Sequence, residues 1–523
     1  MNYNYSNIST KDNCIYINEL KISNFSLMPK WYEIRCYLND KGDIMHEKHL
    51  ICFEGVTCQR PDKPREIVFD LETDKDSTKI LRRLPPDFTM FLTSGRNVGV
   101  LNRFLFIGME QLKPQKIYYY EKQGYFRYNG IPHYNLCDMT FSASDNIKIS
   151  NSCDHHLLPH STDGNHMEWL IKYVNASNFD PLLLLSAFFP YCRHLIQRDS
   201  GDDRRFVTYI NAPTSSGKTT HMELIVKISD DNFNMFSLSS DRKGLNTMAE
   251  INGVPMLIDD FNKTRSDSIY KSNTKKLSDM VGQFQSPTVR VIDEKEVGLK
   301  VGFFVTVEEL IDNASTINRG IVVELPGPFV SEEMTWLQQN KSLYIGLIVL
   351  FIKFLLVNED MLKTMVEANR ICINNDTAIF SRYKLDHKIL KTRETLMLTK
   401  ILFIEFLKNH FKPEQQYIDE IDGKFTNSIN DCTLSTFEFA KCEADKEGTE
   451  YVDMIAELVF CVQSRYLSRV TENVNYFMKY NPKVIGLYDN SEGCVCFKTE
   501  DLLHYFNSLE DFKSKPTVKS IIK

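Results

Sequence analysis

Residues 211–220 read Asn-Ala-Pro-Thr-Ser-Ser-Gly-Lys-Thr-Thr and lie between two mainly apolar segments, Phe206–Ile210 and Met222–Val226. A short strand, a loop of small residues and a helix, in this order, are typical of a triphosphate-binding site. The backbone N–H groups of such a loop point into one concavity, and the positive end of the helix adds to their attraction for phosphate. The residues that we expect to line this loop are Pro213, Thr214, Ser215, Ser216, Gly217, Lys218, Thr219 and Thr220.

Two side chains of this loop would act directly on ATP and Mg²⁺. Lys218 can reach the β- and γ-phosphates, and the Thr219 hydroxyl can ligate the metal. Ala212 stands where the usual pattern has glycine, which a backbone with negative φ tolerates. A Ser- and Thr-rich turn that happens to precede a lysine is the alternative, but the strand and helix on either side favour the nucleotide site.

An acidic pair ends the apolar segment Val254–Ile258, farther along the chain. A buried parallel strand that runs into two carboxylates would bring them to the edge of the sheet where the nucleotide binds. We expect Asp259 to lie on the Mg²⁺ side and Asp260 to polarise the attacking water. Taken alone, a solvated Asp-Asp turn would be the better interpretation; together with the loop, the catalytic one is favoured.

Composition limits the class of protein. The chain has 523 residues, of which 42% are hydrophobic and 25% charged, enough for several domains with cores of their own. The net charge of −7 argues against a globally basic nucleic-acid binder, so any contact with DNA would come from local basic groups.

The sequence gives no sign of secretion or of a membrane span. Its first residues lack the basic and apolar regions of a signal peptide. The most apolar stretch, Tyr344–Val357, is shorter than the ~20 residues needed to cross a bilayer, so it predicts a buried helix. The 13 cysteines follow no regular framework, which fits free thiols in a reducing cytoplasm.

Two groups of metal-ligating residue types need an interpretation. Cys153, His155, His156 and His160 lie close together in a polar segment and form either a metal site or a histidine-containing linker; the linker is favoured because no matching Cys or His pair is nearby. Cys494-Val495-Cys496 alternates as in a strand, which favours a buried apolar role for its thiols over metal or redox chemistry.

The pattern of residues divides the chain into three regions. Residues 1–150 predict a β-rich N-terminal domain, followed by a polar linker. Residues 164–328 predict the ATPase core with a helical lead-in. Residues 329–523 are mainly helical, and their last part has an order of elements similar to a winged helix.

With these motifs in view, the chain resembles the superfamily-3-like, AAA+-type helicase ATPases of phages, plasmids and other mobile elements, in particular the family called domain of unknown function 927. The segments that carry the resemblance are Ser215–Thr220, Lys243–Glu250, Met256–Asp260 and Phe303–Glu308. The family usually has Glu where Asp260 stands and Gly where Val307 stands. The resemblance covers about residues 20–360 and implies an α/β P-loop NTPase core in a homo-oligomer, a hexameric ring.

Three more residues have catalytic roles by their position. Thr306 and Glu308 follow the apolar segment Val301–Val305 and would sense the γ-phosphate, although Thr306 also fits a helix-capping box. Arg319 precedes the apolar segment Ile321–Leu325 and would act in trans as an arginine finger, or is a surface arginine at the start of a strand.

Two β-prone runs between 284 and 301 surround an acidic turn and predict a hairpin. In a ring-shaped motor such a hairpin can track a nucleic-acid backbone, which makes Arg290 and Lys295 candidate contacts to DNA phosphates. A solvated turn dominated by acids is the competing interpretation.

These observations predict a Mg²⁺-dependent ATPase that acts as a nucleic-acid motor of a mobile element. A DNA-packaging or loading ATPase is a rival of the same class. An ATP-gated oligomeric switch in signalling or anti-phage defence is a rival of another class, and it would hydrolyse ATP slowly without a response to DNA. DNA or RNA as substrate, polarity, ring size, partner proteins and the role of residues 360–523 stay open at this stage.

Overall fold

The computed structural model describes residues 4–497 except for 6–7, 18, 40–41, 75–76, 92–102, 104–105, 107–109, 145–148, 152, 177–178, 198–204, 214–215, 238–252, 262–271, 279–280, 282–289, 293–294, 298–302, 309–313, 326–331, 376–385, 461–466, 471–485 and 490–493. Some side chains within this range also lie outside the description, among them those at 260–261, 290–297 and from 443 onward.

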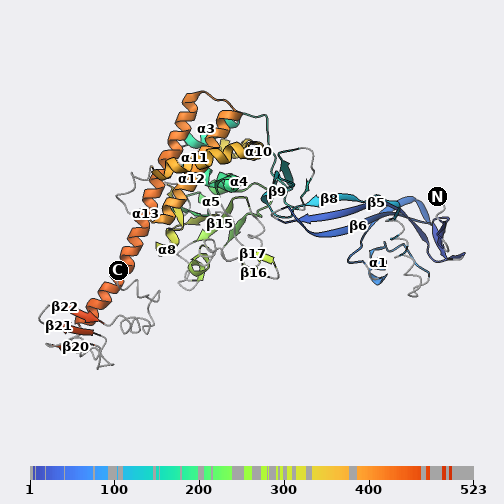
Figure 1. The fold of residues 1–523 in the computed structure, drawn as a ribbon, viewed down its shortest axis with the longest axis horizontal. Helices are drawn as coiled ribbons and strands as arrows, with labels where there is room; N and C mark the ends of the chain where they lie inside the picture. The colour runs from blue at the N-terminus through green and yellow to red at the C-terminus, as the bar shows by residue number, and fades with distance from the viewer. Residues whose placement is uncertain are drawn as a thin grey trace.

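The N-terminal region is an arm built on a long twisted hairpin (Figure 1). Strands β5 (Phe25–Leu38) and β6 (Ile44–Thr57) pair antiparallel at the centre of a five-stranded sheet of order β12-β8-β5-β6-β7. The other strands of this sheet are β7 (Arg60–Asp70), β8 (Gln115–Tyr119) and β12 (Ile149–Ser150). The short strands β1 (Asn4–Tyr5), β2 (Ile8–Lys11), β3 (Cys14–Ile17) and β4 (Leu20–Lys21) form a second sheet.

One face of the arm's main sheet carries a hydrophobic cluster. In β5 buried and partly exposed residues alternate, as expected when one face packs and the other meets solvent. The packed face supplies Phe25, Phe53 and Phe69 to a cluster that also contains residues after α1 (Ser77–Arg83).

A small three-stranded sheet joins the arm to the rest of the molecule. It consists of β9 (Gly124–Tyr128), β10 (Ile131–Leu136) and β11 (Met139–Ser142). The hydroxyl of Tyr134 donates a hydrogen bond to the carbonyl of Gly253, directly before the acidic strand. Gly253 has φ +86, and an added Cβ would lie 2.4 Å from the Cα of Gly124, so glycine is required for this contact.

The central sheet is entirely parallel, as the sequence predicted for an α/β NTPase core. Its order is β14-β15-β18-β13-β19. The strands are β13 (Val207–Asn211), β14 (Met235–Ser237), β15 (Met256–Phe261), β18 (Phe303–Val307) and β19 (Gly320–Glu324). Because β18 lies between the loop strand β13 and the acidic strand β15, its carboxyl end separates the two predicted halves of the site.

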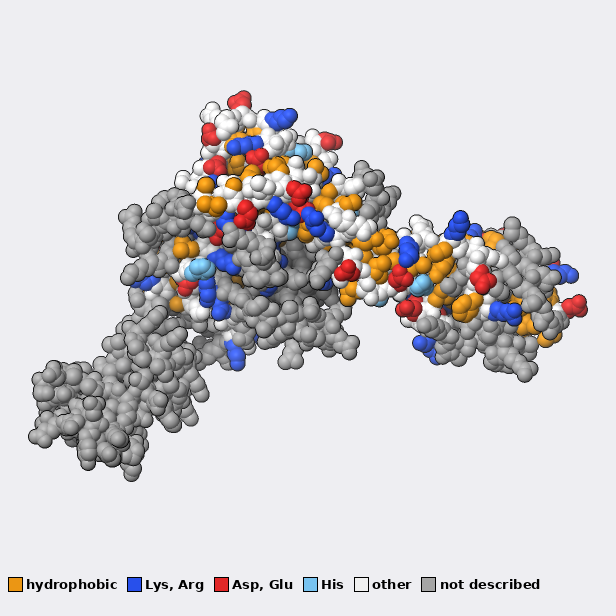
Figure 2. Space-filling view, viewed as in Figure 1, with side chains coloured by type: hydrophobic (Ala, Val, Ile, Leu, Met, Phe, Trp, Pro, Cys, Tyr) orange, Lys and Arg blue, Asp and Glu red, His pale blue; other side chains and the backbone are white. Residues whose placement is uncertain are grey.

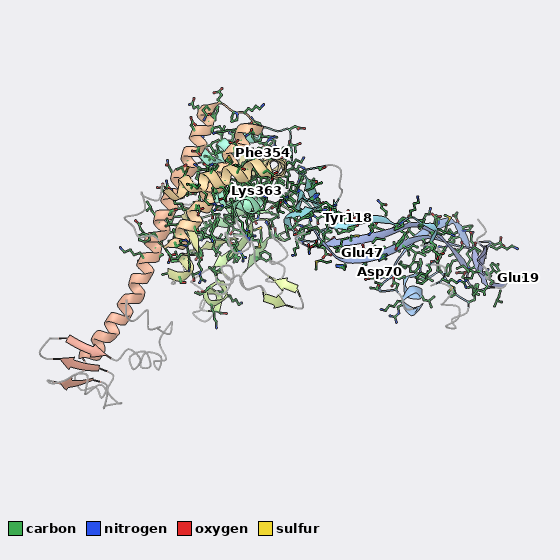
Figure 3. All side chains as sticks on the ribbon, viewed as in Figure 1. Glu19, Glu47, Asp70, Tyr118, Phe354 and Lys363 are labelled. Atoms are coloured by element: carbon green, nitrogen blue, oxygen red, sulfur yellow. The ribbon has the colours of Figure 1, made fainter. Side chains whose placement is uncertain are left out.

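Helices cover this sheet and form the largest hydrophobic core. They are α3 (His166–Asn175), α4 (Pro181–Ile196), α5 (Lys218–Val226), α8 (Ala314–Ile317), α9 (Glu332–Gln339), α10 (Lys341–Val357), α11 (Glu359–Asn375) and α12 (His387–His410). The predicted buried helix at 344–357 is confirmed as α10, most of which is fully buried. Phe354 and Lys363 mark this helical region in Figure 3.

Within the described residues, no single helix is long and apolar enough to cross a membrane; α9 and α10 would pass only as a pair, and the chain bends by 59° between them.

The C-terminal region was predicted to be mainly helical, but its longest helix was not identified individually. Helix α13 (Gln415–Phe460) runs for 46 residues and leads away from the core to the short strands β20 (Leu467–Val470), β21 (Gly486–Asp489) and β22 (Cys494–Phe497) (Figure 1). β22 agrees with the predicted strand at 494–497. The helix predicted for the winged-helix order lies outside the described residues.

Candidate nucleotide-binding site

The loop after β13 turns sharply into α5. Gly217, immediately before the helix, has φ +85, a left-handed conformation that favours glycine. The backbone N–H of Ser216 donates to the carbonyl of Pro213, which closes the turn. Helix α5 begins at Lys218 and includes Thr219 and Thr220, so its N-terminus faces the loop as the sequence predicted. Thr214 and Ser215 lie outside the described residues.

The ammonium of Lys218 lies where two parallel strands end. Its Nζ donates to the carbonyl of Ala212, at 2.5 Å, and to the carbonyl of Val307, at 3.2 Å. A third carbonyl, that of Pro213, is 3.4 Å away. Lys218 thus joins the start of the loop to the end of β18 and holds a positive charge at the carboxyl edge of the sheet.

Asp259 lies between two hydroxyls. The Thr219 hydroxyl donates to its Oδ2 at 2.9 Å, and the Thr306 hydroxyl donates to its Oδ1. These three side chains come from α5, β15 and β18, so the fold joins the loop, the acidic strand and the strand between them. Thr306 lies inside β18 and is fully buried, not at the start of a helix.

This arrangement fits a magnesium ion that also binds a nucleotide. Hydroxyl and carboxylate oxygens are the ligands that Mg²⁺ prefers, and it takes one or two of them from the protein with the rest from water and phosphate. In the described part of the chain no three His, Cys, Asp or Glu side chains gather as metal ligands. A site built from Thr219 and Asp259 does not need such a group.

The remaining predicted residues are partly described. Asp260 belongs to β15, whose register with β18 shifts between Ile258 and Phe261; its side chain lies outside the description. Glu308 directly follows β18 and is half-buried. The strand irregularity therefore falls at the acidic pair, where bulges commonly redirect side chains.

Arg319 lies at the opposite edge of the sheet from the loop. It precedes β19, and its carbonyl accepts a hydrogen bond from Val207, the first residue of β13. Its Nε is buried without a hydrogen-bond partner in the described structure. The length of β13 separates Arg319 from Gly217 of the same chain, so Arg319 cannot reach the phosphates of its own loop.

Two residues that the sequence analysis missed hold the far end of α5. Nζ of Lys341 donates to the carbonyl of Glu223 at 2.6 Å, and the Tyr344 hydroxyl donates to that of Ile225 at 2.7 Å. Burial, with a contribution from Lys227, lowers the pKa of Lys341 to about 8. A cation at a helix C-terminus is favourable. The sequence, however, does not show that the start of α10 lies beside the C-terminus of α5.

The predicted hairpin is present in the backbone. Strands β16 (Arg290–Ile292) and β17 (Lys295–Val297) pair antiparallel. The side chains of Arg290 and Lys295 lie outside the description, so their contact with DNA stays a prediction.

The histidine-rich segment is a packed connection. His155 bonds to Asp231 at 2.5 Å and His156 to Asp138 at 2.8 Å. The carboxylate of Asp138 raises the pKa of His156. Among the described residues these histidines join no metal-ligand cluster with Cys153. Of Cys494 and Cys496 only the backbone of β22 is described.

Comparison with known proteins supports the fold. No protein-family profile and no curated protein matches the sequence. A solved structure described as the active helicase Cch of SCCmec type IV matches with a TM-score of 0.54 and 13% identity, over 99% of this chain and 96% of that chain. The NrS-1 C-terminal region matches with a TM-score of only 0.27 and 13% identity, over 77% and 88% of the two chains, and carries no argument. The chain therefore shares the fold of a helicase structure.

Proposed function

We propose that the protein is a Mg²⁺-dependent ATPase that works as a nucleic-acid motor of a phage, plasmid or other mobile element. It would be a distant relative of the superfamily-3-like, AAA+-type helicases that include the domain of unknown function 927. The observation that carries the proposal is the convergence of Lys218, Thr219, Asp259 and Thr306 at one edge of a parallel sheet. The likeness in fold to a helicase structure supports it.

In this proposal the loop binds the triphosphate. The N–H groups between Pro213 and Thr220 and the end of α5 surround the phosphates, and Lys218 exchanges its carbonyl partners for phosphate oxygens. Thr219 and Asp259 would hold Mg²⁺, which supplies charge neutralisation to the β- and γ-phosphates. Asp260 would orient water for attack on the γ-phosphorus, with ADP as leaving group.

Thr306 and Glu308 would report the state of the γ-phosphate to β18. Thr306 already donates to Asp259, so loss of the phosphate would change the partners of the same carboxylate. Because β18 lies between the loop and the acidic pair, its residues are well placed to sense the γ-phosphate.

The position of Arg319 favours a shared site. Because it lies at the edge opposite its own loop, it can serve a phosphate only on a neighbouring subunit. A closed homo-oligomer, which we propose to be a hexameric ring in the cytoplasm, would supply that neighbour at each interface. Arg290 and Lys295 on the β16–β17 hairpin would then contact DNA.

One observation favours a second candidate, an ATP-gated switch. The net charge of −7 is unusual for a protein whose partner is a polyanion. The two functions separate in one assay, steady-state ATP hydrolysis with and without single-stranded DNA. Strong stimulation supports the motor, and ATP-dependent assembly with negligible turnover supports the switch. Negative-stain images with ATP and DNA would add whether a ring closes on the strand.

A further inference from the structure

Near the β5–β6 turn, no described helix packs on one face of the arm's main sheet, although Leu50 and Cys52 farther along that face are buried. The elements that pack on this sheet contribute Leu84, Phe88 and Met90 to the face that carries Phe53 and Phe69. Figure 2 shows hydrophobic side chains mixed with both signs of charge over the visible side of the arm. The strand register decides which residues belong to the second, open face.

Three neighbouring strands place rings in one row on this open face. Tyr37 of β5 is paired with His46 of β6 and with Tyr119 of β8. The rings of Tyr37 and His46 stack at 4.3 Å between centroids and 9° between planes, and those of Tyr37 and Tyr119 at 5.6 Å and 27°. The guanidinium of Arg35 lies 5.3 Å from the centroid of the Tyr119 ring. The result is a stacked column across the sheet, named here the ring column: His46, Tyr37, Tyr119 and Arg35.

The ring column is open at the end that His46 forms. His46 is exposed, and β7 pairs with β6 only as far as Leu50, so no strand of this sheet lies beside the outer face of the imidazole. Trp31 lies on the same open face of β5, farther along the strand, and is half-buried. A flat aromatic group such as a nucleobase can therefore extend the column without displacing any of its members.

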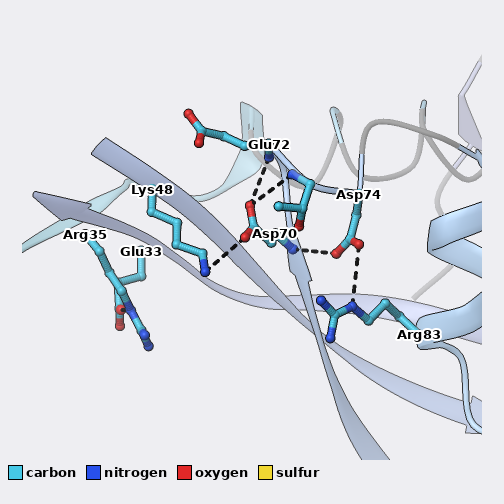
Figure 4. Close-up of polar contacts among 8 residues, drawn as sticks. Glu33, Arg35, Lys48, Asp70, Glu72, Asp74 and Arg83 are labelled. Atoms are coloured by element: carbon cyan, nitrogen blue, oxygen red, sulfur yellow. Dashed lines mark hydrogen bonds and ion pairs between the residues drawn. The ribbon is translucent and has the colours of Figure 1, made fainter. Parts of the chain in front are cut away.

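The ion pairs of this face point their cations outward. Lys48 pairs with Asp70 at 3.0 Å, and their side chains are 39% and 8% exposed. Arg35 pairs with Glu33, and their side chains are 34% and 16% exposed. Asp70 also accepts from the backbone N–H groups of Glu72 and Thr73, as Figure 4 shows.

A ligand that approaches this part of the sheet thus meets ammonium and guanidinium groups before it meets carboxylates. The exposed acid Glu66 belongs to the open face but lies toward the other end of the hairpin, opposite Glu54 of β6. Beside the ring column the cations of these two pairs are more exposed than their carboxylates, which suits a phosphate backbone, while the exposed Asp43 lies in the adjoining turn.

We infer that the open face of the arm binds single-stranded nucleic acid, with a base stacked on the ring column and phosphates beside Arg35 and Lys48. Stacking on aromatic side chains, beside cations that follow the backbone, is how single strands are held without sequence preference. A duplex hides the faces of its bases and would bind weakly here. The inference deepens the proposed function, since it assigns the motor a strand-holding surface outside its ATPase core.

The test is binding of a fluorescein-labelled oligo(dT) to the full-length chain without nucleotide, followed by anisotropy. The double variant Tyr37→Ala/Tyr119→Ala should bind about 10-fold more weakly, the loss expected from one or two stacked bases. Tyr37→Phe/Tyr119→Phe keeps both rings and should bind as the wild type does. Tyr417→Ala removes another partly exposed tyrosine, on α13, and should also leave affinity unchanged. Ultraviolet cross-linking to oligo(dT) should label peptides from β5, β6 or β8.

Equal affinity of the Ala double variant and the wild type would overturn the inference, as would an equal loss in Tyr417→Ala. Loss of a wild-type dimer in the Ala variant, with affinity for oligo(dT) unchanged, would instead assign this face to a second copy of the chain and also overturn it. The binding assay contains no ATP, so its result does not depend on whether the protein is a motor. A lack of DNA-stimulated ATP hydrolysis would count against the proposed function alone.

Discussion

Thr219 and Asp259 are 40 residues apart in the sequence, yet the threonine hydroxyl donates to the aspartate at 2.9 Å. The contact joins the first turn of α5 to the end of β15. It joins the loop after β13 and the acidic strand in one candidate site.

The two aspartates should differ in kind when each is changed to asparagine. Asp259→Asn removes the negative charge that the Thr219 and Thr306 hydroxyls face, so Mg²⁺-dependent ATP binding should weaken. Asp260→Asn should keep binding and lose hydrolysis, because an amide does not polarise water. Fluorescent-nucleotide titration with and without Mg²⁺, together with phosphate release, checks both. Normal hydrolysis by Asp260→Asn would show that our assignment of the acids is wrong.

Lys218→Ala should weaken ATP binding roughly 10- to 100-fold, the value of one or two charge-assisted hydrogen bonds to phosphate. The same ammonium also bridges Ala212 and Val307, so a thermal unfolding midpoint must accompany the titration. Lys408→Ala, an exposed lysine at the end of α12, is the matched control. If both variants hydrolyse ATP as the wild type does, the nucleotide site lies elsewhere.

The central sheet could be predicted because its strands combine apolar runs with chemically distinctive ends. Val207–Asn211 runs into the Gly-Lys-Thr loop, and Met256–Phe261 contains the acidic pair. The sequence analysis did not identify β7, which contains Pro61 and Pro64. Proline disfavours the interior of a sheet, but an edge strand tolerates it, since one side of such a strand needs no hydrogen bonds. Its position at the edge is a property of the sheet and cannot be read from the segment itself.

The sequence also did not predict which distant residues hold the C-terminal end of α5. Lys341 and Tyr344 begin a helix that was recognised for its apolar content alone. Their bonds to the last carbonyls of α5 depend on how α10 crosses the core. The sequence likewise predicted Thr306 as a site residue, as a sensor or as a helix cap. Because β18 includes Thr306, the helix cap is wrong, and the sensor role stays a prediction.

Lys341 should give the protein a pH-dependent stability. Its pKa of about 8 in the folded state lies below its usual 10.5, so the unfolded chain binds more protons between these two values. The free energy of unfolding should therefore gain a rising contribution from pH 8 to 10.5, absent below pH 8. Lys341→Met should remove that slope, whereas Lys408→Met should retain it. Denaturant unfolding at several pH values measures the slope, and identical slopes in Lys341→Met and wild type would refute this role.

Arg319→Ala should retain nucleotide binding but lose turnover by about 10³-fold or more, the usual value of an arginine that stabilises charge in the transition state. Because Arg319 lies at the sheet edge opposite its own loop, a finger role for it would need the acceptor site to belong to a neighbour. Wild-type turnover per subunit should accordingly fall on dilution to monomers. Constant turnover on dilution would contradict the shared site.

Mixing two impaired variants tests whether the loop and Arg319 of different subunits form one site. Arg319→Ala and Lys218→Ala should each hydrolyse ATP much more slowly than the wild type alone, because each lacks one half of every interface. When the two are mixed at concentrations where subunits exchange, some interfaces pair the intact loop of the first variant with the intact arginine of the second. Turnover should return in part, and the measurement is phosphate release by the mixture against each variant by itself. Full activity of Arg319→Ala alone would exclude the arginine finger, and a silent mixture would mean that loop and arginine do not meet across subunits.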